Sequence, residues 1–291
     1  MKKRAGKWAL VVEGGGMRGV FAAGVLNAFG KAGFDPFDLY IGVSAGACNL
    51  ASHLAGQNDR NFDIIERYSS TKRFINLLRF VRGGHLMDLD WLWDVTILEY
   101  RLDLKRLFGT LHAREKEFLV AVTSMDRGEA LYLRPDETTL EHALKVSSAL
   151  PLLYRGNLFA DTERAADGGV ADSIPVREAY RRGAGRITVI RTRASDYRMA
   201  AGRMEKLGSM AFRKHPRFAK ALEERAENYN ASVRFINDPP VGIIIDEIAP
   251  LPGEGPGRAT RDMRVLRLAY LRGVERGSDF VKNYHAGEKT R

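Results

Sequence analysis

The chain has 291 residues, 45% of them hydrophobic, which suffices for a sizeable core and favours one large α/β domain over residues 1–291. Its 46 Lys and Arg residues outnumber the 36 Asp and Glu residues, and the net charge of +10 suits an anionic partner, either a membrane surface or a nucleic acid. A single cysteine excludes an internal disulfide framework and a cysteine-based structural zinc site. No apolar run approaches the ~20 residues that span a bilayer, so we expect a cytoplasmic protein that contacts membranes only peripherally.

Basic residues are most abundant in the stretch 177–234, which holds 15 Lys and Arg residues against 6 Asp and Glu residues. The stretch carries few aromatic residues at the spacing that base stacking needs, so nucleic acid is not expected as a partner. A solvated helical face accounts for most of the surplus, and the same charge favours peripheral contact with anionic membranes.

A glycine-rich loop follows the first apolar run. Trp8–Val12 is typical of a short buried strand, and Gly14-Gly15-Gly16-Met17-Arg18-Gly19 leads from it into a helix rich in small residues. This pattern matches a dinucleotide-binding fingerprint, which also requires an acidic residue at the end of the next strand. Asp35 and Asp38 instead precede that strand, Leu39–Ile41, so the nucleotide interpretation is disfavoured.

The same loop also suits the binding of an oxyanion. Unpaired backbone N–H groups of Gly14, Gly15 and Gly16 at the start of a helix converge on negative charge. Arg18 lies within the loop and raises the positive potential there. We therefore expect an oxyanion-stabilising loop.

A second motif, Gly42-Val43-Ser44-Ala45-Gly46, comes directly after the apolar run Leu39–Ile41. Its pattern is that of a nucleophile elbow, a strand–turn–helix junction that holds a serine in a strained conformation with its hydroxyl projecting. Gly42 and Gly46 let the neighbouring strand and helix approach without Cβ clashes. At the N-terminus of that helix, Ser44 lies where developing negative charge is favoured.

In this order, the glycine loop and the serine elbow resemble the patatin-like phospholipase family. That family combines a glycine-rich oxyanion loop ending in Arg-Gly or Lys-Gly with an early serine elbow, and its second catalytic residue is an aspartate in an Asp-Gly-Gly or Asp-Gly-Ala motif. This chain contains Asp167-Gly168-Gly169. The resemblance covers residues 8–192 and implies a three-layer α/β/α fold with a mostly parallel central sheet, acting without a metal or a cofactor.

The resemblance also implies roles for individual residues. Ser44 is the expected nucleophile and Asp167 the expected general base of a catalytic dyad. The oxyanion hole is expected from Gly14, Gly15 and Gly16, with Arg18 beside them. The remaining motif glycines are Gly19, Gly42, Gly46, Gly168 and Gly169. Asp161 is a rival acid, but no glycine follows it.

A Ser-His-Asp triad is the alternative mechanism. The six histidines are His53, His85, His112, His142, His215 and His285, and none lies in a motif that ends a triad. His215 and His285 follow Asp167 in the chain order of an α/β-hydrolase, which keeps that interpretation open. An α/β-hydrolase normally has several strands before its elbow, however, and this chain has room for fewer than two.

The remaining pattern predicts elements on both sides of the Asp167 motif. Residues 62–106 are expected to be mostly helical, interrupted at Gly83-Gly84, and residues 72–106 are either core or a lipid-facing lid. Residues 193–291 are expected to complete the domain. The predicted elements are a hairpin of Glu117–Thr123 and Ala130–Leu133, helices over Thr139–Ser147, Pro175–Arg182, Met204–Val233 and Thr260–Tyr284, and strands over Arg186–Thr192 and Val241–Ile245.

The sequence thus predicts a serine acyl hydrolase that cleaves lipid carboxylic esters of the phospholipid or lysophospholipid type through an acyl-Ser44 intermediate. Two alternatives remain open. One is an α/β-hydrolase-type esterase with a triad, and the other is a catalytically vestigial basic protein that binds anionic membranes.

Overall fold

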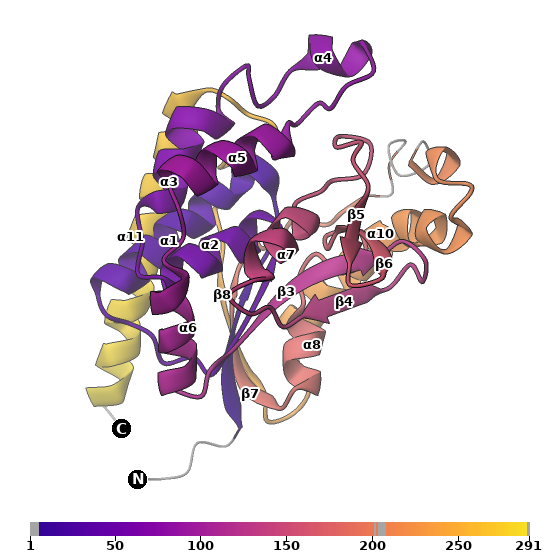
Figure 1. Cartoon of the computed structure of the whole chain (residues 1–291). Coiled ribbons are helices and arrows are strands. Elements are labelled where there is room, and N and C mark those ends of the chain that lie inside the picture. Colours follow the sequence, from indigo (N-terminus) through magenta and orange to yellow (C-terminus); the bar gives the residue numbers. More distant parts are fainter. Residues whose placement is uncertain (1–5, 201, 203–207, 290–291) are drawn as a thin grey trace.

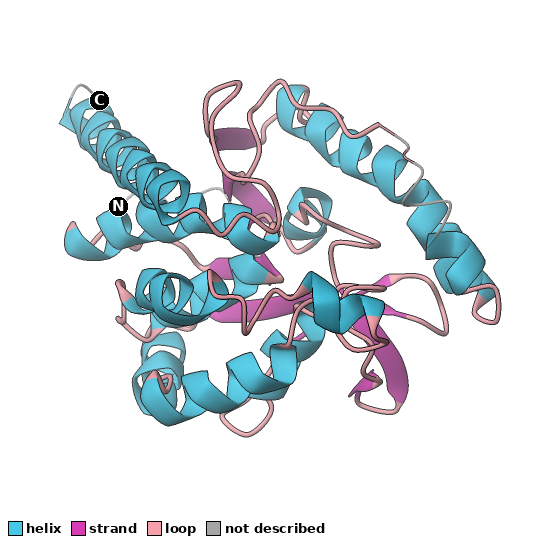
Figure 2. Ribbon diagram, turned by 90° about the horizontal axis from the view of Figure 1, so that it is seen from above, coloured by secondary structure: helices cyan, strands magenta, loops and turns pink. Residues whose placement is uncertain are grey.

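The computed structural model describes residues 6–200, 202 and 208–289. A central sheet lies between two layers of helices, with α1, α2, α6 and α11 on one face and α8 and α10 on the other, which confirms the expected three-layer α/β/α fold (Figures 1 and 2). The strands are β1 (Lys7–Val12), β2 (Leu39–Val43), β3 (Glu117–Ser124), β4 (Ala130–Leu133), β5 (Leu158–Ala160), β6 (Glu163–Asp167), β7 (Ala184–Ile190) and β8 (Ile244–Ile248).

The helices follow the predicted order along the chain. They are the 3-10 turn η1 (Gly16–Arg18), α1 (Gly19–Lys31), α2 (Ala45–Leu54), α3 (Arg60–Ile64), the π-helical turn η2 (Ile65–Ser69), α4 (Leu77–Val81), α5 (Leu89–Glu99), α6 (Leu104–Ala113), α7 (Leu140–Ser147), α8 (Val176–Arg181), α10 (Pro216–Asn237) and α11 (Met263–Lys289).

The sheet is mostly parallel, as expected. Its strand order is β5-β6-β3-β2-β1-β7-β8, with β4 paired to β3 off this path. The five strands β3, β2, β1, β7 and β8 are mutually parallel, whereas β4, β5 and β6 pair in antiparallel fashion. Along β1, Trp8 and Leu10 pack against one layer of helices, while Ala9 and Val11 pack against the other. Both faces of the central strands are therefore buried, as parallel sheets require.

The strands β2 and β6 pair with consecutive stretches of the same edge of β3, and their last residues are neighbours there. The last residue of β2, Val43, pairs with Ala121, and the last residue of β6, Asp167, pairs with Val122. Because β4 occupies the opposite edge of β3 at the same positions, β2 and β6 share one edge and run toward each other. The residue after β2 and the residue that ends β6 are thereby brought together.

Residues 60–113 form several short helices instead of the longer ones that the sequence pattern predicts. Five helical segments, from α3 to α6, replace the nearly continuous pattern expected over residues 62–106. The predicted interruption at Gly83-Gly84 is confirmed, since Gly83 has a φ of +94° that disfavours other residues. The segment just before it, α4, stands apart from the body at the top of Figure 1.

Two predictions for the C-terminal region were wrong in their bounds. The buried strand expected over Val241–Ile245 is β8, which begins at Ile244 and forms the edge of the sheet, so that Ile244 is 53% exposed. The helix expected over Met204–Val233 is interrupted: residues 208–211 are helical, a turn follows over 212–215, and α10 then begins at Pro216, a residue suited to the first turn of a helix. Residues 203–207 lie outside the described part of the chain.

Candidate active site

Ser44 occupies the sharp turn between β2 and α2. Its φ of 53° and ψ of −125° are a strained combination for a residue with a Cβ, at a cost of about 1–3 kcal/mol. The Ser44 backbone N–H donates to the Ser147 hydroxyl at 2.8 Å. A Cβ at Gly46 would lie 2.4 Å from the carbonyl oxygen of Val12, so glycine there lets α2 pack directly onto β1. The elbow geometry expected from the sequence is present.

Asp167 lies beside Ser44 and is only 3% exposed. Its Oδ1 accepts the backbone N–H of Gly169 at 2.7 Å, whereas Oδ2 has no hydrogen-bond partner among the described residues. Burial raises the pKa of this carboxyl group, and the Gly169 N–H, the Ser44 hydroxyl and the charge of Arg225 oppose that shift. A carboxylate with a raised pKa and an unengaged oxygen next to a serine is chemically suited to accept a proton.

The glycine loop lines the same small polar cavity as Ser44 and Asp167, with about 260 Å³ of empty space. Within the described residues, the backbone N–H groups of Gly15 and Gly16 donate to no protein acceptor. Gly16 has a φ of +57°, which favours glycine at this position. Donors left unpaired at a helix start are suited to stabilise an oxyanion.

A buried ionic network fixes the start of this loop. Glu13 is 1% exposed, and its carboxylate accepts the Thr192 N–H at 2.6 Å, Arg191 Nε at 3.2 Å and the Tyr229 hydroxyl at 3.0 Å. Arg191 is itself fully buried and also contacts Glu247 at 2.5 Å. Charges at this depth are retained only when they are paired, so the network holds the residue before Gly14 in one position.

The C-terminal region contributes two arginines to the polar cavity. Arg225 and Arg258 both line it, and Arg225 Nε donates to the carbonyl oxygen of Gly169 at 2.7 Å. The carbonyl oxygen of Arg258 accepts the backbone N–H of Met17 at 3.0 Å, within the glycine loop. Residues of the C-terminal region thus form hydrogen bonds to both the Asp167 motif and the glycine loop.

Arg18 lies outside both cavities that Ser44 lines. It is 8% exposed, and within the described part of the chain its Nε has no hydrogen-bond partner. Burial, together with the charges of Arg193 and Arg258, lowers its pKa to about 10. The side chain is therefore positioned to act on the loop by its charge rather than by direct contact with a ligand at Ser44.

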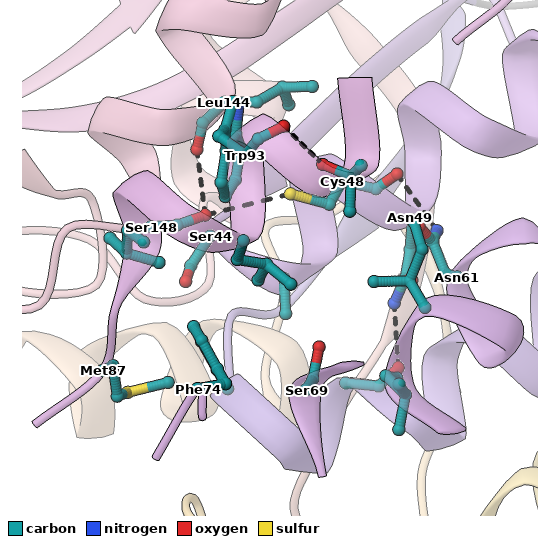
Figure 3. Close-up of a pocket in the computed structure, with 18 of the residues that line it drawn as sticks. Ser44, Cys48, Asn49, Asn61, Ser69, Phe74, Met87, Trp93, Leu144 and Ser148 are labelled. Carbon is teal, nitrogen blue, oxygen red and sulfur yellow. Dashed lines mark hydrogen bonds between the residues drawn. The ribbon is translucent and has the colours of Figure 1, made fainter. Parts of the chain in front are cut away.

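A larger, mostly apolar cavity opens on the other side of Ser44. It contains about 980 Å³ of empty space, part of it open to solvent, and its apolar wall includes Phe74, Met87, Leu89, Leu92, Trp93 and Leu144. Figure 3 shows Phe74 and Met87 across the cavity from Trp93 and Leu144. Cys48 is partly exposed on this wall, with its Sγ 3.8 Å from the Ser148 hydroxyl. An acyl chain fits a cavity of this size and composition.

The histidines considered for a triad lie elsewhere. Among the described residues, none lines either cavity at Ser44. His285 packs against Phe34 near the first residues of β1, at the opposite end of the sheet, and His53 lines a separate cavity. His215 precedes the first turn of α10. The rival acid, Asp161, is exposed in the turn between β5 and β6.

The structure therefore brings together Ser44, Asp167 and the glycine loop. The end of α7 and the residues that follow it pack beside the elbow: the Ser147 hydroxyl accepts the Ser44 N–H, and the Ala149 carbonyl oxygen accepts the Asp167 N–H at 3.0 Å. Sequence reasoning missed Ser147, Glu13, Arg225 and Arg258 as parts of the site. Most of their contacts join residues far apart in the chain, which no local pattern records.

Within the described residues, no group of three or more His, Cys, Asp or Glu side chains is arranged to hold a metal ion. No helix in that part of the chain has the length and apolar character to cross a membrane.

Comparison with known proteins assigns two regions of the chain. Residues 10–180 match the model of the patatin-like phospholipase family, and residues 215–287 match a domain of unknown function, DUF6363. YjjU of Escherichia coli is 38% identical over 252 residues, which cover 84% of this chain and 69% of that protein. Lysophospholipase NTE1 of Debaryomyces hansenii is 27% identical over 187 residues, or 60% of this chain but only 11% of the yeast protein.

Among solved structures, VipD from Legionella pneumophila aligns with 96% of this chain and 67% of its own, at a TM-score of 0.45 and 14% identity. The family model covers more than half of the chain and includes the glycine loop, the serine elbow and the Asp167 motif. This match supports a lipid hydrolase activity. The chain belongs to the patatin-like phospholipase family.

Proposed function

We propose that this protein is a serine acyl hydrolase that cleaves carboxylic esters of phospholipids or lysophospholipids. Ser44 is the nucleophile, Asp167 is the general base, and the backbone N–H groups of Gly14, Gly15 and Gly16 form the oxyanion hole. The observation that carries the proposal is the position of Ser44 between a polar cavity, which contains Asp167 and the glycine loop, and an apolar cavity of acyl-chain dimensions.

In the first half of the reaction, Ser44 Oγ attacks the ester carbonyl carbon and its proton passes to Asp167. The unengaged Oδ2 of Asp167 supports this transfer, because that oxygen has no competing partner among the described residues. Negative charge develops on the carbonyl oxygen, and each well-placed N–H donor stabilises it by ~2.7–4 kcal/mol. The protonated Asp167 then gives the proton to the departing alcohol, which leaves an acyl-Ser44 ester.

In the second half, Asp167 accepts a proton from water as the water oxygen attacks the acyl carbon. The bond from that carbon to Ser44 Oγ then breaks, Asp167 returns the proton to Ser44 Oγ, and a fatty acid is released. The apolar cavity holds the acyl chain during both steps, and the polar cavity receives the oxygens of the reacting ester. Arg18, which lies outside both cavities, raises the positive potential of the glycine loop. No metal or cofactor takes part in this scheme.

The experiment is hydrolysis of a phospholipid and of a lysophospholipid by the purified protein, with products identified by mass spectrometry. The wild-type protein is expected to release fatty acid, and Ser44→Ala to release none. Ser52→Ala is a matched control, because Ser52 is also buried and lies on α2 but lines neither cavity at Ser44. Equal hydrolysis by Ser44→Ala would refute the proposal. Absence of hydrolysis by the wild type would favour the vestigial alternative.

We also propose that residues 1–291 act as one domain, although two family models divide the chain. This is supported by β8, which extends the same sheet as β1, and by α11, whose Tyr270 and Val281 share core clusters with residues of α1. The two arginines of the polar cavity come from the C-terminal region as well.

A further inference from the structure

Residues 71–88 form an arm that projects from the body and carries α4 at its tip (Figure 1). Its two strands of chain are joined at the neck, where Ile75 and Met87 form an antiparallel bridge. Backbone hydrogen bonds from Asn76 to Leu86, at 2.9 Å, and from Asp88 to Phe74, at 3.0 Å, flank this bridge. The arm is thus a hairpin held by backbone hydrogen bonds rather than an irregular loop.

Arg79 crosses the arm and ties its two sides together. Its Nε donates to the carbonyl oxygen of His85 at 2.8 Å, and its Nη2 donates to that of Phe74 at the same distance. Its Nη1 forms an ion pair of 3.1 Å with Asp88. The Asn76 side chain caps α4 by accepting the Arg79 N–H. These bonds preform the tip, which lowers the entropy lost when it binds a surface.

The tip presents large aliphatic side chains to water. Leu77, Leu78 and Val81 are 68%, 58% and 76% exposed. Single exposed apolar residues are common on protein surfaces, but three on one short, capped helix that stands clear of the body form a candidate binding surface.

The same arm is rich in basic residues. The arm contains Lys72, Arg73, Arg79 and Arg82, while its single acidic residue, Asp88, is paired with Arg79. Lys72, Arg73 and Arg82 are all exposed. Exposed apolar residues together with exposed basic ones are the composition that binds an anionic lipid surface.

The basic stretch 177–234 offers less than its composition suggests. Arg181 and Arg182 pair with Glu178, and Arg191 is buried in the ion network of Glu13. Part of that surplus of positive charge is therefore paired or buried within the protein.

The arm is continuous with the cavity at Ser44. Phe74 and Met87 belong to its neck and line the apolar cavity, as Figure 3 shows. With the tip inserted among acyl chains, the neck would offer an unbroken apolar surface from the lipid leaflet to the serine.

We propose that residues 71–88 dock the protein on the surface of an anionic phospholipid bilayer, with Leu77, Leu78 and Val81 inserted below the head groups and the basic residues in contact with them. This inference rests on the proposed function for its biological sense, since it explains how substrate reaches Ser44. Its physical content, membrane binding through the arm, is independent of catalysis.

The test is sedimentation with vesicles of phosphatidylcholine alone or mixed with phosphatidylglycerol, using the Ser44→Ala protein so that the lipid stays intact. The triple variant Leu77→Ser, Leu78→Ser, Val81→Ser is expected to weaken binding at least tenfold, since each deeply inserted leucine contributes roughly a tenfold effect. A matched control replaces three exposed aliphatic residues of α11, Val265, Leu268 and Leu271, with serine. The control is expected to bind as the unmodified protein does.

A second variant, Lys72→Gln with Arg82→Gln, separates charge from insertion. Its binding to mixed vesicles is expected to fall by roughly fivefold for each charge removed, and its salt dependence to become shallower. Binding to pure phosphatidylcholine should change little. Both tip variants, prepared with Ser44 intact, are expected to hydrolyse a soluble short-chain ester at the wild-type rate.

Unchanged vesicle binding by the aliphatic tip variant would overturn the inference. So would a change in oligomeric state with vesicle binding preserved, because the tip would then contact another copy of the chain. Failure of the wild type to hydrolyse the soluble ester, with binding still dependent on the tip, would refute the proposed function and leave the docking surface standing.

Discussion

The hydroxyl of Ser147 accepts the backbone N–H of Ser44 at 2.8 Å and donates to the carbonyl oxygen of Ala121 at 2.6 Å, so one buried side chain joins the elbow to the neighbouring strand. Since Ser147 is fully buried, no water replaces it easily. The strained backbone of Ser44 is held in place from outside the elbow motif itself.

Ser147→Ala should leave the Ser44 N–H buried and unpaired, at a cost of about 1–3 kcal/mol in the free energy of unfolding. Relaxation of the elbow should also lower kcat by about tenfold. Ser148→Ala is the control, because the Ser148 hydroxyl bonds back to its own helix at Leu144. Denaturant unfolding and steady-state kinetics measure the two effects, and equal behaviour of the two variants would contradict this account of the elbow.

The pH dependence of kcat/KM should report Asp167. Burial raises the pKa of its carboxyl group, so activity should fall on the acid side at a pH above the ordinary aspartate value of ~3.9. The charge of Arg225 works against that shift. Arg225→Gln should therefore move the acid limb to higher pH, and Arg225→Lys should move it less. An acid limb that stays in place or moves down in Arg225→Gln would argue against Asp167 as the base.

Asp167→Asn should stabilise the fold while it abolishes activity. A carboxyl group whose pKa is raised by folding contributes stability below its unfolded pKa of ~3.9 and loses that contribution as pH rises through its folded pKa. At neutral pH the folded protein thus bears the cost of a buried charge, which a neutral amide removes. Each 1 kcal/mol recovered should raise Tm by about 2 °C. A lower Tm at neutral pH, with an equal Tm at low pH, would contradict this balance.

A fragment ending at residue 200 should fail to fold. It would lack β8, which pairs with β7, and the Arg258 carbonyl oxygen that accepts the Met17 N–H. The full chain should unfold in one cooperative transition by both circular dichroism and tryptophan fluorescence. A soluble, active fragment would show instead that the C-terminal region is a separate unit.

Much of this site could be predicted because its central parts are local motifs. The loop at Gly14–Gly16 and the elbow at Ser44 each lie within a few residues, and the strand order then follows ordinary parallel-sheet connections. Ser147 and Arg258 could not be found this way, because each contacts the site across more than 100 residues and neither has a distinctive neighbourhood. The edge position of β8 was missed for a related reason. An apolar run does not reveal whether the strand will have a neighbouring strand on one side or on both sides.

The mid-chain helices show the same limit. Their apolar residues serve both the core and the cavity wall, so composition alone could not separate lid from core over residues 72–106. Leu92 and Trp93 line the cavity, while Leu77 and Leu78 face water on α4. Only the folded arrangement distinguishes these roles.

The most direct test of the Ser44–Asp167 dyad is kcat/KM on a soluble ester for four folded proteins: wild type, Asp167→Asn, His215→Ala and His285→Ala. The dyad predicts that Asp167→Asn loses activity by about a thousandfold or more, because its amide cannot accept the serine proton, while both histidine variants stay within a few fold of wild type. Loss of turnover in either folded histidine variant would contradict the dyad and restore the triad, whatever the activity of Asp167→Asn, because a triad also depends on its aspartate.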